Sequence, residues 1–150
     1  MITDNKLKNK VGEIGEGMLI NALGGYGRFV DAEGYDVETV YQGNLIRIES
    51  KCARSIYFDE GQWTFHLSNP QMRMIKRRKL DAVWLVCLTE KMNEFLTFLI
   101  PSAELKFKKD GLIIIRINNI NKQDYAKWIV KDEDQVKEVL RGINKKKHQS

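Results

Sequence analysis

The sequence is poor in the residues that mark disulfide frameworks, thiolate metal sites and imidazole catalysis. Its 150 residues include two cysteines and two histidines. Cys52 and Cys87 lie in apolar or strand-like segments without metal-ligand spacing, which favours buried free thiols over a disulfide. We interpret His66 as a strand residue rather than a general base. His148 belongs to the terminal segment, which we expect to be a mobile tail.

The chain also lacks a hydrophobic run that could cross a membrane. The longest apolar runs, such as residues 82–88, are far shorter than the roughly 20 residues that a spanning helix needs. The first residues form no apolar signal region, and no repeat or low-complexity linker divides the chain. We therefore expect one domain over residues 1–150, in the cytoplasm and without membrane contact.

Positive charge is present in excess and is clustered. The net charge is +5, and the basic residues gather at 76–79, 106–109 and 145–147. Such clusters can neutralise phosphates along a nucleic-acid backbone. Each cluster taken alone is explained equally well as a solvated helix face or a chain terminus. The charge therefore permits an anionic partner without establishing one.

Hydrophobic periodicity predicts alternating helices and strands. Apolar steps of three and four over residues 7–23 predict a first helix that ends at a Gly-Gly pair. Gly12, Gly15 and Gly17 interrupt it, which indicates either a fraying turn or a surface that another backbone approaches closely. Ser68 ahead of Pro70 predicts the start of a second helix, and residues 132–140 predict a third.

The predicted strands are short, as expected for one sheet-based domain. A compact connection at residues 42–44 indicates a hairpin between the second and third strands. Residues 59–61 are expected to join two further strands. The strands are predicted at residues 28–30, 35–41, 45–51, 55–58, 62–67, 81–88, 94–101 and 112–117.

The third strand ends in an acid and a base on one face. Glu49 and Lys51 project to the same side because side chains alternate along a strand. If the short turn sets the hairpin register, Asp36 lies beside Glu49. Mg²⁺ accepts one or two carboxylates together with waters, and it can polarise a phosphate and activate water. A neighbouring lysine could orient or deprotonate that water, or stabilise charge on the phosphate.

Asp36 followed by Glu49-Ser50-Lys51 resembles the motif of the PD-(D/E)xK nucleases. Members of this superfamily include small archaeal Holliday-junction resolvases and intron-encoded homing endonucleases. The resemblance covers residues 13–101, and it departs from the motif at Tyr35, where the family name has a proline. An isolated acid-x-lysine triplet is usually a surface ion pair worth under about 1 kcal/mol, so the resemblance depends on Asp36 and on the order of elements.

The resemblance implies an α/β fold of restriction-endonuclease type, with a mixed central β-sheet flanked by α-helices. It also implies a divalent metal, Mg²⁺ or Mn²⁺, held by Asp36, Glu49 and the Ser50 carbonyl. Glu16 on the first helix matches a glutamate that joins this site in small members, and Glu13 is the alternative. Gln71 resembles a glutamine that some members place beside the catalytic lysine.

The implied function is metal-dependent endonucleolytic hydrolysis of DNA by a homodimer or homotetramer. A four-way junction, a specific duplex site and another DNA substrate all remain open. The other hypothesis is a non-catalytic DNA-binding or assembly protein that retains the fold. Residues from about 102 onward are interpreted as a C-terminal extension for oligomer or substrate contacts. The candidate DNA contacts are Lys76, Arg77, Arg78, Lys79, Trp63 and Arg54.

Overall fold

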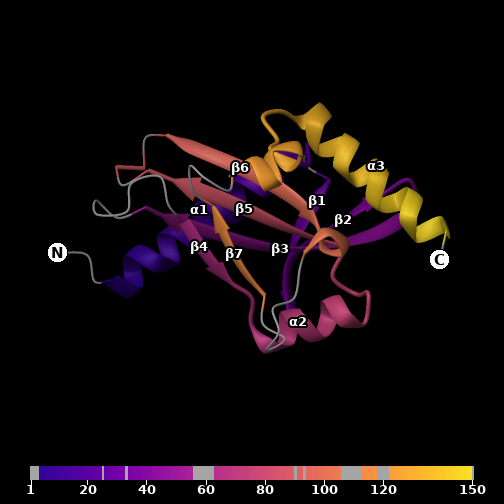
Figure 1. Cartoon of the computed structure of the whole chain (residues 1–150), viewed down its shortest axis with the longest axis horizontal. Coiled ribbons are helices and arrows are strands. Elements are labelled where there is room, and N and C mark those ends of the chain that lie inside the picture. Colours follow the sequence, from indigo (N-terminus) through magenta and orange to yellow (C-terminus); the bar gives the residue numbers. More distant parts are fainter. Residues whose placement is uncertain are drawn as a thin grey trace.

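A five-stranded mixed sheet forms the centre of the computed structural model (Figure 1). The structure describes residues 4–24, 26–32, 34–55, 63–89, 91–92, 94–105, 113–117 and 122–149. Strands β3 and β5 are parallel, and the other neighbouring strands are antiparallel. The strands in spatial order are β1 (Gly27–Ala32), β2 (Tyr35–Tyr41), β3 (Asn44–Arg54), β5 (Ala82–Leu88) and β6 (Phe95–Pro101).

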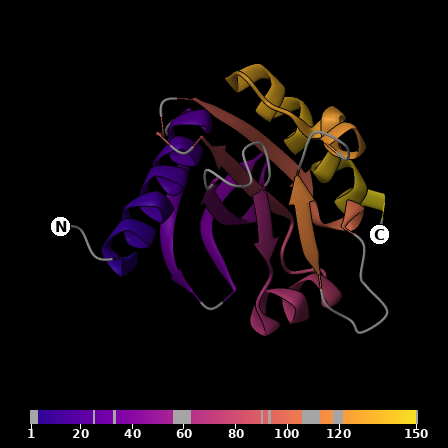
Figure 2. The same ribbon diagram turned by 60° about the vertical axis from the view of Figure 1, so that its left-hand side comes forward.

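Both faces of the sheet are covered. Helices α1 (Asp4–Ala22) and α3 (Glu133–Gln149) pack on one face. The other face carries helix α2 (Asn69–Lys76) and a two-stranded antiparallel sheet of β4 (Trp63–His66) and β7 (Ile114–Ile117), as Figure 2 shows from the side. Every residue of β5 is buried, as expected for a central strand between two cores. None of the described helices is long and apolar enough to cross a membrane.

The predicted hairpin of β2 and β3 is confirmed. Its two turn residues, Gln42 (φ 49°) and Gly43 (φ 82°), are both left-handed, which is the geometry whose twist matches two antiparallel strands. The turn sets Val37 opposite Ile48. This register also places Asp36 and Glu49 opposite each other at the far end of the hairpin.

One prediction about the second half of the chain is wrong. The third helix was expected over residues 132–140 but continues to Gln149, because Ile143 and Asn144 keep one side of it buried. Lys145, Lys146 and Lys147 therefore lie on a helix and not in a mobile tail. Strand β4 pairs with β7, about fifty residues along the chain, and the strand expected at residues 55–58 falls largely outside the described residues.

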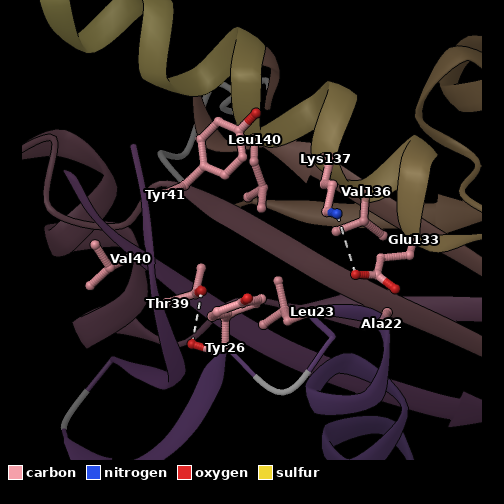
Figure 3. Close-up of a pocket in the computed structure, with 10 residues that line it drawn as sticks. All are labelled: Ala22, Leu23, Tyr26, Thr39, Val40, Tyr41, Glu133, Val136, Lys137 and Leu140. Carbon is pink, nitrogen blue, oxygen red and sulfur yellow. Dashed lines mark hydrogen bonds and ion pairs between the residues drawn. The ribbon is translucent and has the colours of Figure 1, made fainter. Parts of the chain in front are cut away.

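The beginning of α3 meets the end of α1 and β2 around a small hollow of about 40 Å³ (Figure 3). Thr39 Oγ1 donates to the Tyr26 carbonyl at 3.0 Å, and Lys137 pairs with Glu133 at 3.5 Å. A volume of this size admits a water molecule and not a substrate. The hollow is therefore a packing feature of the α1–α3 contact.

Candidate active site

The β2–β3 hairpin brings the predicted acids and the lysine together. Ile46 and Ile48 are fully buried on one face of β3, so Glu49 and Lys51 project from the opposite face. Asp36 lies across from Glu49, and its Oδ2 accepts a hydrogen bond from the Ser50 backbone N–H at 3.2 Å. The Glu49 side chain is 6% exposed and that of Lys51 is 26% exposed. The Glu49 carboxyl is therefore shielded from water, whereas the Lys51 side chain is partly exposed.

The carboxyl group of Glu49 is placed unfavourably for a negative charge. Burial raises its pKa from 4.5 to about 9, with further increases from the hydrogen bond and the repulsion of Asp36. Lys51 and Gln71 lower the pKa by smaller amounts, and the Lys51 Nζ lies 4.0 Å from Glu49 Oε1. Two carboxylates thus share a site in which one ammonium compensates them only partly.

Glu38, on the same face of the sheet, is a buried carboxylate whose charge is compensated, unlike that of Glu49. The sequence did not predict its role. Glu38 is 4% exposed, and both Nε and Nη2 of Arg28 contact its Oε1. The Tyr35 hydroxyl donates to its other oxygen at 3.4 Å. Because Arg28 and Tyr35 satisfy Glu38, this cluster is a closed ion pair. The sequence signal for this pair is an arginine and a glutamate on neighbouring strands. They can be matched only when the register between β1 and β2 is known.

Helix α1 brings Glu16 to the same site. The pKa of Glu16 is raised by burial, then by the charge of Asp36, and then by Glu13. Glu13 itself is exposed on the helix surface. Of the two glutamates considered from the sequence, Glu16 is therefore the one that interacts with Asp36.

A close contact at Gly15 fixes the position of α1 on the sheet. A Cβ at this position would lie 2.7 Å from the Cys52 Cβ, nearer than side-chain atoms can approach. The buried indole N–H of Trp84 donates to the Gly15 carbonyl at 3.1 Å. Among the described atoms, nothing lies within 4 Å of a Cβ added at Gly12 or Gly17. Of these three glycines, only Gly15 is thus required by the close approach of α1 to β3.

The start of helix α2 supports Glu49 through Gln71. Ser68 caps the helix as predicted: its backbone N–H donates to Gln71 Oε1 at 2.8 Å, and its Oγ accepts from the Gln71 N–H at 3.4 Å. Because the amide oxygen of Gln71 faces Ser68, its NH₂ group is the donor to Glu49. The side chain is 7% exposed. Capping of α2 therefore orients a hydrogen-bond donor toward the site.

The remaining candidate residues lie away from this cluster. The Trp63 indole N–H donates to the Leu88 carbonyl at 2.8 Å, and Arg54 is the last, half-buried residue of β3. Their role as DNA contacts stays a prediction. The basic residues 76–79 are exposed at the end of α2. The basic cluster at residues 106–109 lies outside the described residues. Cys52 and Cys87 are free thiols, as predicted.

The donor set fits a hard divalent cation with few protein ligands. Within the described ranges, no three Asp, Glu, His or Cys side chains converge closely enough to enclose a metal by themselves. Mg²⁺ commonly takes one or two carboxylates and fills its other positions with water and phosphate oxygens. The paired carboxylates of Asp36 and Glu49 match this pattern, and a cation between them would offset the burial and the Asp36 repulsion that raise the pKa of Glu49.

Comparison with known proteins supports the fold. No protein-family model matches the sequence, and no curated protein matches it either. The fold is similar to the 1.6 Å structure of Archaeoglobus fulgidus Hjc, a Holliday junction resolvase from an archaeal hyperthermophile. The TM-score is 0.50 at 12% sequence identity, over 80% of this chain and 90% of that chain. This likeness confirms the predicted α/β class, a mixed sheet flanked by helices.

Proposed function

We propose that the protein is a metal-dependent DNA endonuclease whose site is formed by Asp36, Glu49 and Lys51. The observation that carries this proposal is the pairing of two poorly compensated carboxylates beside a lysine on one shielded strand face. A structural ion pair, such as Glu38 with Arg28, has no need of such an arrangement. The fold likeness to a resolvase adds support from an independent direction.

Each residue has a role that follows from its position. Asp36 and Glu49 hold the cation, with Glu16 and the Ser50 carbonyl as additional ligands. Bound Mg²⁺, or Mn²⁺, supplies charge stabilisation on the scissile phosphate and a bound water of lowered pKa. Lys51 orients the attacking water and stabilises negative charge that develops on the phosphate. Gln71 keeps the Glu49 carboxylate in its orientation.

The substrate proposed first is branched DNA, because the similar structure is that of a Holliday junction resolvase. A site-specific duplex cutter would use the same carboxylates and lysine, since specificity depends on other surfaces. Cleavage of two strands requires two sites, so a homodimer or homotetramer is proposed.

Cleavage assays test the proposal directly. The purified protein is incubated with a labelled four-way junction, a linear duplex of the same sequence and a supercoiled plasmid, each with Mg²⁺, Mn²⁺ or chelator. We expect cleavage that requires metal and is fastest on the junction. Cleavage that continues in chelator would contradict the metal site. Binding without cleavage of any substrate would support the non-catalytic alternative.

Matched variants assign the roles. K51A is expected to reduce the cleavage rate by about a hundredfold or more, the usual effect of losing an acid–base group. E49Q should reduce it because it removes a proposed metal ligand. E16Q is expected to reduce it as well, whereas E13Q, one turn away on the same helix, keeps the wild-type rate. Equal losses in E16Q and E13Q would exclude a specific role for Glu16.

A further inference from the structure

A large hollow lies between the end of α2 and the end of α3. Its volume is about 520 Å³, and it is bounded also by the start of β5 and by the short helix η2 (Ser102–Glu104). Both apolar and basic side chains line it, together with the acid Asp81. The lining residues that carry the argument are Ile75, Leu80, Lys76, Arg78, Lys146 and Lys147.

The hollow unites two basic clusters that are far apart in the sequence. Residues 76–79 follow α2 and residues 145–147 end α3, and side chains of both clusters line the same cavity. We call this surface the basic hollow. It is defined by the lining residues Lys76, Arg78, Asp81, Lys146 and Lys147, by their chain neighbours Arg77, Lys79 and Lys145, and by Glu104, which pairs with Lys146. Read separately, each cluster could be a solvated helix face, but four cations from both clusters line one cavity.

The net charge of the residues that define this surface equals the net charge of the whole chain. It holds seven of the 25 Lys and Arg residues and two of the 20 Asp and Glu residues, which leaves 18 of each sign elsewhere in the chain. Lys146 pairs with Glu104 at 3.2 Å and Lys147 with Asp81 at 2.9 Å. The cations at 76–79 and Lys145 are exposed. The basic hollow therefore keeps a net charge of five after its own acids are counted.

The backbone at Arg78 has a conformation that is unusual for a residue other than glycine. Its φ of 57° is left-handed, and such a position after a helix usually holds glycine because other residues are strained there by about 1 kcal/mol. Cations favour helix C-termini, which explains one basic residue at the end of α2. It does not explain four consecutive ones, with an arginine at the strained position.

We propose that the basic hollow binds the phosphate backbone of the DNA strand that flanks the cleavage site. This inference rests on the proposed nuclease function. Gln71, next to Glu49, and Lys76 are five residues apart on α2, or about 7.5 Å along a helix axis. Helix α2 thus carries both a residue beside the carboxylates and a residue that lines the basic hollow.

Salt dependence of DNA binding tests this contact without requiring cleavage. Affinities for a labelled duplex and a four-way junction are measured in chelator between 50 and 200 mM salt. The variants are K76Q/R78Q on the α2 side and K145Q/K146Q on the α3 side. The control, K131Q/K137Q, removes the same charge from exposed positions before and within the first part of α3.

Each variant of the basic hollow is expected to reduce the slope of log affinity against log salt by about 1.8, since each lost phosphate contact contributes about 0.9. The loss should be the same for unrelated DNA sequences. An equal effect in K131Q/K137Q, or an unchanged slope in both test variants, would overturn the proposal. Failure of the wild-type protein to bind DNA would instead refute the proposed function itself.

Discussion

At the residue scale, the buried glutamates Glu38 and Glu49 have different electrostatic environments. Glu38 is neutralised by Arg28, whereas Glu49 is buried against Asp36 with Lys51 at 4.0 Å. The sequence predicted that Asp36, Glu49 and Lys51 lie together, because strand alternation and a short hairpin turn are local features. It did not predict the pair of Glu38 and Arg28, because that pair depends on the register between β1 and β2.

The metal-free protein should lose stability as pH rises. The pKa of Glu49 is raised from 4.5 to about 9 in the folded state, so its contribution is full below about pH 4.5 and is lost progressively toward pH 9. E49Q should flatten this dependence and be more stable than wild type at pH 8 by at least about 1 kcal/mol, the value of one pKa unit. Urea unfolding in chelator at several pH values measures this.

The neighbouring carboxylate provides the control for this experiment. E38Q removes a charge that Arg28 compensates, so it should destabilise the protein by about 1 kcal/mol. The opposite signs of E49Q and E38Q separate uncompensated charge from burial alone. If both variants destabilise the protein equally at pH 8, the Asp36–Glu49 repulsion is not significant.

Divalent metal should reverse this loss. Metal binding requires deprotonated carboxylates and stabilises only the folded state. Addition of Mg²⁺ should therefore raise the unfolding midpoint of the wild type more at pH 8 than at pH 5.5, and should leave E49Q unchanged. An equal midpoint shift in E49Q would place the metal elsewhere.

At the scale of elements, the contact of α1 with β3 decides whether Glu16 reaches the site. Gly15 lies against Cys52, and the Trp84 indole holds its carbonyl. Glu16 follows directly and interacts with Asp36. The sequence predicted the helix, and it explained its glycines either by a fraying turn or by the close approach of another backbone. Only the packing identified Gly15 as the position of close approach.

Substitution of the three helix glycines should give opposite results. G15A forces α1 away from β3 and should destabilise the protein by about 1 to 3 kcal/mol, the usual effect of overpacking. G12A and G17A should stabilise it by up to about 1 kcal/mol, because alanine favours helix and both positions have open space. Thermal unfolding measures all three. G15A should also reduce cleavage at temperatures where it remains folded, whereas stability equal to that of G12A would contradict the close contact.

At the scale of the whole molecule, the C-terminal third supports the hairpin that carries the site. Asn144 of α3 donates to Gln42 Oε1 in the hairpin turn at 3.0 Å, and Lys147 donates to the Leu45 carbonyl at 2.9 Å. Val136, Leu140 and Ile143 of α3 belong to the same core as Ile46 and Ile48. The segment interpreted from the sequence as an extension thus packs on the back of the candidate site.

Removal of α3 should therefore abolish cooperative folding. A chain ending at residue 131 exposes the core around Ile46 and Ile48 and should show no sharp thermal transition. The smaller change L140A should destabilise the protein by about 2 to 5 kcal/mol. Calorimetry compares both with a chain that lacks only residues 148–150. A cooperative transition at the wild-type temperature in the chain ending at 131 would make the segment a dispensable extension.

The resemblance of the sequence to a known family implied the α/β class. By itself the sequence determined the β2–β3 hairpin, the capped start of α2 and the grouping of Asp36, Glu49 and Lys51. These features arise from alternation, turn chemistry and capping, which act over a few residues. Only the tertiary structure decided the β4–β7 pairing, the approach of α1 at Gly15 and the meeting of two basic clusters at one hollow. They depend on packing between segments distant along the chain, where the contacting partner is set by the sheet order and not by neighbouring residues.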